Sequence, residues 1–323
     1  MRALVTGGAG FIGHHLVDGL LSRGHDVSVI DDFSTGQHSR LAGFGDAVSV
    51  TEASILDADA LDAAVAGAEV IFHEAAIASV ARSLREPRLT NDVNENGTIE
   101  VMRAASRNGV RRVVFAGSSA AYGIPAELPC KESHRPAPRS PYGVSKLAAE
   151  LYVHALGEAL GIETVVLRYF NVYGLGQDPA SEYAAVIPRF VTAVLDGRQP
   201  MINGSGDISR DFVYIDDVVE ANLLASRAAI PPSLTCNIAT GSPTSLDQLL
   251  RAVALSVGRG VDPTFGPPRP GDIPHSYADI AVARRVLGYE PRTTLADGIA
   301  RTVDWYRATM KTPTFTAGSR SSD

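Results

Sequence analysis

Short apolar runs rich in β-branched residues alternate with amphipathic stretches along the first half of the chain. Such runs predict strands that are buried on both faces, as in a parallel sheet. They are Ala3–Val5, Val27–Ile30, Val70–His73, Val113–Ala116 and Thr164–Leu167. Apolar residues at helical spacing between them predict helices over 12–21 and over Asn94–Ser106. The alternation predicts an α/β fold with a doubly wound parallel sheet.

The pattern becomes less regular after Arg168. Asn171–Ser181 and the proline-rich stretch Pro263–Pro274 predict irregular loops. Amphipathic spacing predicts helices over Val186–Leu195 and Leu295–Tyr306.

This change divides the chain into two predicted domains. We expect a first domain over 1–170 and a smaller C-terminal one over 171–311, with about 212–240 returning to the first, and a frayed tail over 312–323. A length of 323 residues agrees with about two domains.

Composition and charge exclude several classes of function for this chain. The formal net charge of −7 gives no electrostatic case for nucleic-acid or anionic-membrane binding. The two cysteines are too few for a disulfide framework or a cysteine-rich metal centre, and the histidines show no metal-ligand pairing. With no apolar run long enough to span a bilayer and no leader pattern after Met1, we expect a cytosolic protein.

A glycine-rich turn, Thr6–Gly13, joins the first predicted strand to the first helix. Gly7, Gly10 and Gly13 suit a tight turn whose backbone N–H groups approach a pyrophosphate at the helix N-terminus. Asp31 at the end of the second strand suits a ribose diol and repels a 2′-phosphate, which favours NAD over NADP. A plain strand-to-helix turn uses the same glycines, and Asp31 could be a solvated strand end.

Tyr142 and Lys146 stand four residues apart, so they share one face of a helix. A free tyrosine has a pKa of about 10, and a nearby ammonium together with the positive nicotinamide ring would lower this pKa toward the range of a useful base. Ser118 and Ser119 follow the fourth predicted strand, whose carboxyl end should line the ligand crevice. A tyrosine and a lysine at this spacing also occur by chance on surface helices.

Taken in order, these motifs resemble the extended short-chain dehydrogenase/reductase family, in particular its NAD-dependent nucleotide-sugar epimerases and dehydratases. The resemblance covers roughly residues 1–306 and adds four segments to those above: His73–Ala76, Asn94 with Gly97–Thr98, Ala121–Gly123 and Leu167–Gly174. It implies a Rossmann cofactor domain, a UDP-sugar substrate and a homodimer. The family often has an aspartate before the isoleucine that contacts adenine, whereas this chain has Ala53–Ile55.

The resemblance also implies roles for single residues. The catalytic group would be Ser118, Tyr142 and Lys146, with Ser119 as the competing serine. The cofactor site would comprise Gly7, Gly10, Phe11, Ile12, Gly13, Asp31, Ile55, Ala75, Ala76, Asn94, Tyr142 and Lys146. The substrate site would comprise Ser79, Ser118, Ser119, Asn171, Ala185, Val186, Arg210, Arg269, Asp272 and Ser276. Guanidinium groups at 210 and 269 suit a diphosphate, although arginines are mostly exposed surface charges.

The residues after Ser118 favour one reaction of the family. Its 4,6-dehydratases carry an Asp-Glu pair there, and this chain has Ser119 and Ala120, which favours 4-epimerisation. In the related 4-epimerases the position of Ser276 lines the pocket near C2 of the sugar, where a small side chain leaves room for an N-acetyl group. UDP-uronate epimerisation or decarboxylation, and a non-catalytic NAD sensor, remain as alternatives.

Overall fold

The computed structural model describes residues 1–178, 185–267 and 273–310. It contains a seven-stranded sheet in the order β11-β6-β5-β4-β1-β2-β3, with every pair parallel. The strands are β1 (Arg2–Thr6), β2 (Asp26–Asp31), β3 (Val48–Glu52), β4 (Val70–His73), β5 (Arg112–Ser118), β6 (Glu163–Tyr169) and β11 (Ser233–Ile238). The predicted doubly wound parallel sheet is therefore confirmed. The strand order reverses between β1 and β4, where this fold forms its ligand crevice.

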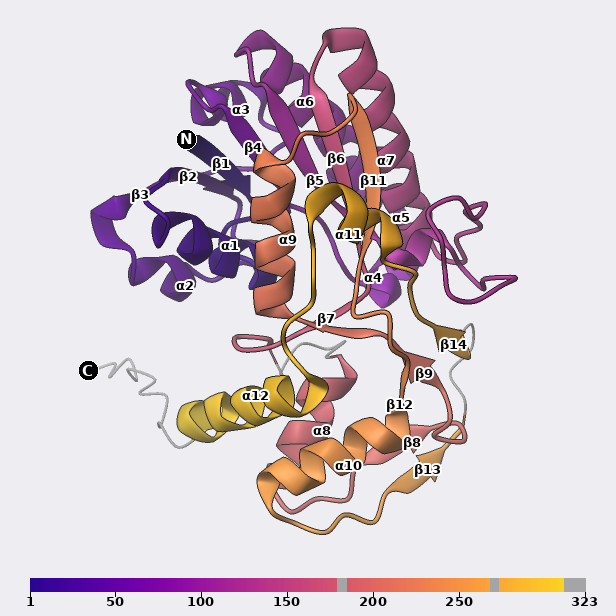
Figure 1. Cartoon of the computed structure of the whole chain (residues 1–323). Helices are drawn as coiled ribbons and strands as arrows, with labels where there is room; N and C mark the ends of the chain where they lie inside the picture. The colour runs from indigo at the N-terminus through magenta and orange to yellow at the C-terminus, as the bar shows by residue number, and fades with distance from the viewer. Residues whose placement is uncertain (179–184, 268–272, 311–323) are drawn as a thin grey trace, which may run out of the picture.

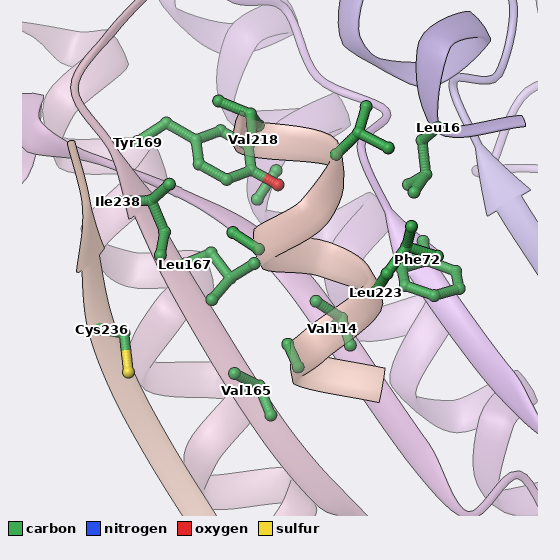
Figure 2. Close-up of a cluster of buried hydrophobic side chains, with 14 of the residues drawn as sticks. Leu16, Phe72, Val114, Val165, Leu167, Tyr169, Val218, Leu223, Cys236 and Ile238 are labelled. Carbon is green, nitrogen blue, oxygen red and sulfur yellow. The ribbon is translucent and has the colours of Figure 1, made fainter. Parts of the chain in front are cut away.

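Helices cover both faces of this sheet (Figure 1). One face carries α1 (Phe11–Leu21), α9 (Ile215–Arg227) and α11 (Ala281–Leu287), and the other carries α3 (Ala58–Val65), α6 (Gly97–Arg107) and α7 (Pro141–Leu160). Figure 2 shows Val218 and Leu223 of α9 lying over Val114, Leu167 and Tyr169 of the sheet. The two apolar layers hold the strand ends, and the site they bear, in fixed positions.

Several short elements lie between the strands and the longer helices. They are α2 (His38–Ala42), η1 (Gly45–Ala47), α4 (Val80–Arg85), α5 (Pro87–Asn91), η2 (Asp92–Asn96) and η3 (Ser119–Ala121). The predicted helix over Asn94–Ser106 is wrong at its start, because Asp92–Asn96 forms a π-helical turn before α6 begins at Gly97. Such turns occur frequently at functional sites.

The second part of the chain packs around its own apolar cluster below the sheet in Figure 1. Its helices are α8 (Val186–Leu195), α10 (Leu246–Val257) and α12 (Leu295–Met310). Its strands form three small sheets: β10 (Phe212–Tyr214) with β7 (Asn171–Tyr173); β12 (Thr244–Ser245) with β9 (Ser209–Arg210) and β14 (His275–Ser276); and β13 (Thr264–Gly266) with β8 (Met201–Asn203). In the part of the chain that the structure describes, no helix is both long and apolar enough to cross a membrane.

Two predicted loops contain strands. Asn171–Tyr173 opens the first predicted loop as β7, and Thr264–Gly266 lies in the proline-rich stretch as β13. Both runs have only three residues and obtain their hydrogen bonds from partners far along the chain, so the local pattern does not reveal them. The tail over 312–323 lies outside the described residues, and the division into two domains stays a prediction.

Candidate functional site

The glycine turn adopts a backbone that other residues would strain. Gly7 has φ +69, and a Cβ there would lie 2.8 Å from the backbone of Ala75. A Cβ on Gly13 would lie 2.1 Å from the Gly7 carbonyl oxygen. No side chain caps α1, so the N–H groups of Phe11 and Ile12 face the crevice without helical partners. Together with the helix dipole they form an anion site suited to a pyrophosphate.

Asp31 organises this turn from the end of β2. Its Oδ2 accepts a hydrogen bond from Ala9 N–H at 2.8 Å, and its Oδ1 accepts one from Phe33 N–H at 2.9 Å. Burial raises the pKa of the Asp31 carboxyl, while these two backbone donors lower it. Each oxygen has a further lone pair for a ribose hydroxyl.

The segment of the predicted adenine contact, Ser54–Ile55, packs against the start of α6. Ile55 is buried and packs so closely on Gly97 that a Cβ there would meet its Cδ1 at 2.5 Å. The Ser54 hydroxyl accepts a hydrogen bond from Leu56 N–H at 3.2 Å and retains its own proton for donation. The turn, the helix N-terminus and the Asp31 carboxylate together fit an NAD molecule.

A directed hydrogen-bond chain fixes the backbone after β4. Thr98 Oγ1 donates to the Asn94 carbonyl oxygen at 2.6 Å, so it accepts from His73 Nε2 at 2.9 Å. His73 Nδ1 then accepts from Thr6 Oγ1 at 2.7 Å, and Thr6 Oγ1 accepts from Ala75 N–H at 3.2 Å. The chain assigns the Nε2–H tautomer to His73 and places Ala75 against the glycine turn.

Asn94 lies in the π-helical turn and is almost fully buried. Its Oδ1 accepts from Ile77 N–H at 2.7 Å, and its Nδ2 donates to the Ile77 carbonyl at 3.2 Å and to Ser145 Oγ at 3.0 Å. Both amide protons of Asn94 thus bond to groups of the protein and fix the backbone at Ile77. Its place in the cofactor site stays a prediction.

Tyr142 and Lys146 lie in the first turns of α7, as the spacing predicts. The Ser140 hydroxyl caps the helix by accepting from Gly143 N–H at 3.1 Å. Ser83 Oγ anchors the same turn by accepting from Tyr142 N–H at 3.0 Å. The strand β5 ends at Ser118, whose side chain lies close enough to the Tyr142 phenol to lower its pKa. The structure therefore brings Ser118 near Tyr142, whereas Ser119 does not act on the phenol.

The expected lowering of the Tyr142 pKa requires the nicotinamide ring as well as Lys146, and it stays a prediction. Burial raises the pKa of the Tyr142 phenol, and only the Ser118 contact opposes this rise. The Lys146 ammonium lies 4.1 Å from the centroid of the Phe115 ring. Burial lowers the pKa of Lys146 to about 8, whereas Glu74 and Glu150 raise it. Desolvation thus dominates the charge state of both predicted catalytic groups.

The sheet of β12, β9 and β14 brings together two distant substrate candidates. Arg210 and Ser276 are register partners in the pair of β9 with β14, and both are partly buried. The Arg210 guanidinium donates to the Ser209 carbonyl at 2.9 Å and to the Pro274 carbonyl at 3.3 Å. Arg269 and Asp272 lie outside the described residues.

The other substrate candidates lie at element ends. Ser79 caps α4 by accepting from Arg82 N–H at 3.1 Å, and Asn171 is exposed at the start of β7. Ala185 and Val186 lie at the N-terminus of α8. Ala76 is partly buried, three residues beyond β4.

Sequence reasoning missed a group of buried polar residues at the same edge of the sheet. Tyr169 donates to Glu74 Oε1 at 2.8 Å, and Asn222 Nδ2 donates to the Tyr169 hydroxyl at 2.8 Å. The sequence points to this group by one feature, a glutamate directly after a strand that is predicted to be buried. Asn222 lies on α9, far from the other two along the chain, so no local pattern connects them.

Comparisons with known proteins agree with this arrangement. The model of the NAD dependent epimerase/dehydratase family matches residues 3–239. The UDP-glucose 4-epimerase of Mycolicibacterium smegmatis is 42% identical over 95% of this chain and 99% of its own length. More distant relatives include proteins named as a probable UDP-glucuronate 4-epimerase, at 31% identity, and a UDP-N-acetyl-alpha-D-glucosaminuronate decarboxylase, at 30%.

Solved structures give the same result. The UDP-glucose 4-epimerase of Thermotoga maritima, solved with UDP-glucose, has a TM-score of 0.92 at 38% identity and covers 96% of this chain and 100% of its own. The UDP-N-acetylglucosamine 4-epimerase of Methanobrevibacter ruminantium also has a TM-score of 0.92, at 35% identity, covering 96% and 99%. The sequence, the fold and the crevice at β1 and β4 agree: this chain belongs to the NAD dependent epimerase/dehydratase family.

Proposed function

We propose that this protein is a 4-epimerase of UDP-hexoses. Its family and its relatives make it an NAD-dependent UDP-sugar epimerase. The observation that carries the finer proposal is the contact of Ser118 with Tyr142, with Lys146 one turn further along α7. The residues after Ser118 are Ser119 and Ala120, which offer no carboxyl groups for eliminating water from the sugar.

When bound, NAD would accept the hydride from C4 of the sugar and later return it, and its positive charge would favour the Tyr142 phenolate. Tyr142 removes the proton of the sugar 4-hydroxyl, while Ser118 holds that oxygen in place. The ammonium of Lys146 favours the phenolate of Tyr142. A pocket in which the 4-keto sugar can turn would let the hydride return to the other face of C4. Tyr142 then returns the proton, so the protein ends as it began.

Ser276 supports acceptance of N-acetylated UDP-hexosamines. It lies in β14 opposite Arg210, which we propose as a ligand of the substrate diphosphate together with Arg269. A serine at this position leaves room beside C2 of the sugar, whereas a large aromatic residue would fill it. UDP-N-acetylglucosamine and UDP-N-acetylgalactosamine should therefore be substrates beside UDP-glucose and UDP-galactose.

A substrate panel tests the proposal. The purified protein is incubated with UDP-glucose, UDP-N-acetylglucosamine, UDP-glucuronate and dTDP-glucose, and products are identified by NMR. We expect C4 epimers of the first two. Loss of C6 as carbon dioxide, a 4-keto-6-deoxy product, or epimerisation of the uronate alone would each contradict it. Retained NAD without any C4 exchange would identify a sensor.

The substitution Ser276→Tyr tests separately the N-acetylated substrates and the substrates without an N-acetyl group. The tyrosine should abolish turnover of the N-acetylated pair and leave turnover of UDP-glucose unchanged. Its ring would fill the space that only an N-acetyl group occupies. Ser242→Tyr, an exposed serine in the turn after β11, is a matched control that should leave both rates unchanged. Equal loss for both pairs in Ser276→Tyr would refute the assignment of this position.

The quaternary structure is the remaining part of the proposal. Val144, Leu151 and Tyr152 of α7 are 52%, 61% and 41% exposed, and Leu84 of the adjoining α4 is 65% exposed. Apolar side chains gathered in this way on the surface mark protein interfaces. We propose that this face joins two copies of the chain, and that the protein works in the cytosol.

A further inference from the structure

Asp211 is a fully buried carboxyl group that the reaction above leaves unused. It lies between β9 and β10, directly after Arg210. Its Oδ1 accepts from Thr240 N–H at 2.8 Å and from the Thr240 hydroxyl at 2.6 Å. Its Oδ2 accepts from Gly241 N–H at 2.9 Å and from Ala278 N–H at 3.3 Å. A carboxylate has about four lone-pair sites, so these four donors fill its capacity and hold it in one place.

The four donors belong to two segments that are far apart in the chain. The turn 240–241 follows β11, which is an edge strand of the large sheet. Ala278 follows Ser276 of β14 by two residues. Asp211 therefore ties the small sheet that carries Arg210 and Ser276 to the large sheet.

The segment around Ala278 is itself firmly held. Cys130 N–H donates to the Tyr277 carbonyl at 2.8 Å, and Asp279 N–H donates to the Cys130 carbonyl at 2.8 Å. The Asn237 side chain, from β11, donates to the carbonyls of Cys130 and Asp279 at 2.9 Å and 3.1 Å. Ala278 is thus a fixed point to which the carboxylate can attach the small sheet.

The small sheet needs such an attachment. Its strands β9, β12 and β14 have two residues each, and Arg210 pairs with Thr244 on one side and Ser276 on the other. The Arg210 guanidinium donates to the carbonyls of Ser209 and Pro274, which lie in or next to the same sheet. Strands this short are marginally stable on their own. The hydrogen bonds of the neighbouring carboxylate therefore help to fix Arg210 relative to the large sheet.

Charge by itself argues against a carboxylate at this place. We propose that Arg210 binds the substrate diphosphate, and an anion at the next residue repels that ligand. If repulsion were its main effect, Asp211→Asn would strengthen the binding of a diphosphate. If the four hydrogen bonds matter more, Asp211→Asn would weaken it, because the asparagine Nδ2 would face N–H donors with donors of its own. The two explanations thus predict opposite signs.

We propose that Asp211 is a positioning residue of the substrate site, whose carboxylate fixes Arg210 and Ser276 where they meet the diphosphate and the sugar. The inference rests on the proposed function, in which Arg210 binds the diphosphate of the UDP-sugar. Asp211 acts through these two residues, since its own oxygens are occupied by groups of the protein.

Binding of UDP tests the inference without any turnover. The purified protein with NAD bound is titrated with UDP in a calorimeter. Asp211→Asn should raise the Kd for UDP about tenfold or more, because the guanidinium is no longer held in the geometry that binds the diphosphate. A Kd that is unchanged or lower overturns the inference, and so does a wild-type protein that does not bind UDP.

Asp217→Asn is the matched control. Asp217 is also a buried aspartate, and it accepts from Arg292 N–H at 2.8 Å and from Thr293 N–H at 3.1 Å. This variant should unfold at lower urea concentration and leave the Kd for UDP unchanged. If it weakens UDP binding as much as Asp211→Asn does, the loss of any buried aspartate suffices and the inference is wrong.

Thr240→Val serves if Asp211→Asn does not fold. It removes the hydroxyl donor of Thr240 and keeps the carboxylate of Asp211 with its three backbone donors. The Kd for UDP should rise by a smaller factor, and an unchanged Kd would again overturn the inference.

Steady-state kinetics separate positioning from a loss of folded protein. The diphosphate is bound alike in the ground state and the transition state, so Asp211→Asn should raise KM for UDP-glucose and leave kcat nearly unchanged. A merely structural role would lower kcat with the folded fraction at constant KM, and that result overturns the inference. A wild-type protein that binds UDP but exchanges nothing at C4 would refute the proposed function alone, since UDP binding needs no catalysis.

Discussion

Tyr142 and His73 show how burial determines charge at single residues. Both are removed from water at the carboxyl edge of the sheet, and in both burial favours the neutral form. For Tyr142 this raises the barrier to phenolate formation, so the phenol depends on cations placed nearby. For His73, burial keeps Nδ1 unprotonated, so that this atom accepts the hydrogen bond of the Thr6 hydroxyl, which in turn accepts from Ala75 N–H.

Removing the hydroxyl of Tyr142 should abolish catalysis and leave the fold intact. We expect kcat of Tyr142→Phe to fall by about 10²–10⁴, the usual contribution of general acid–base catalysis. NAD content, measured after denaturing the purified protein, should be unchanged. Tyr152→Phe is a matched control, since Tyr152 is exposed on the same helix. A Tyr142→Phe protein that works at the wild-type rate would refute the assigned base.

His73 should make the protein less stable in acid. In the unfolded chain it binds a proton near its usual pKa of 6.5, whereas burial lowers its pKa to about 3 in the folded protein. The unfolded state therefore binds more protons between these values. Stability is lost as the pH falls from about 6.5 toward 3, by up to about 1.4 kcal/mol per pH unit from this group.

Urea unfolding between pH 7 and pH 4.5, followed by circular dichroism, measures this effect. His73→Gln keeps a donor and an acceptor but cannot be protonated, so its stability should depend less steeply on pH. The variant should also be less stable than the wild type at pH 7, since glutamine does not reproduce both hydrogen bonds. Equal slopes for the two proteins would show that His73 does not cause the acid sensitivity.

At the level of elements, an ion pair joins α7 to β6. Arg168 and Glu150 are each only 5% exposed and form two hydrogen bonds between the strand and α7. Arg168→Met should lower the free energy of unfolding by about 3–5 kcal/mol, because it leaves the Glu150 carboxylate buried without its partner. The double variant Arg168→Met with Glu150→Leu should recover most of that loss.

The exposed ion pair of Arg284 with Glu290 is the control for the buried pair of Arg168 with Glu150. Its side chains are 51% and 59% exposed, so Arg284→Met should cost less than about 1 kcal/mol. Urea unfolding of the variants measures these differences. A cost for Arg168→Met as small as that for Arg284→Met would show that the buried pair is not essential to the packing of α7.

The predictability of an element depends on where its hydrogen bonds go. The strands β1, β2, β4, β5 and β6 are recognisable from their apolar runs. The edge strands β3 and β11 were not predicted. Val48–Glu52 is mostly exposed, and Ser233–Ile238 includes polar residues that contact other segments. Their strand character comes from pairing with a neighbour rather than from a local pattern.

At the scale of the whole molecule, the exposed apolar face of α7 and α4 should determine the oligomeric state. We expect Leu151→Glu to give a monomer, because it places a charge in the centre of the proposed interface. Light scattering coupled to size-exclusion chromatography measures the mass. Leu255→Glu changes a leucine of α10 that is 85% exposed, outside this face, and should remain dimeric. A wild-type mass of one chain at micromolar concentration would contradict the interface.

The sequence by itself determined the local chemistry of this protein. The glycine turn, Asp31 after the second strand, and Tyr142 and Lys146 on one helical face depend on residues close together in the chain, so spacing was sufficient. The tertiary structure decided the properties that depend on burial and on contacts between residues far apart in the chain. Arg210 meets Ser276 only through the pairing of β9 with β14. Burial raises the pKa of the Tyr142 phenol in the protein alone, an effect that the sequence does not reveal because the removal of water depends on the packing of the whole fold.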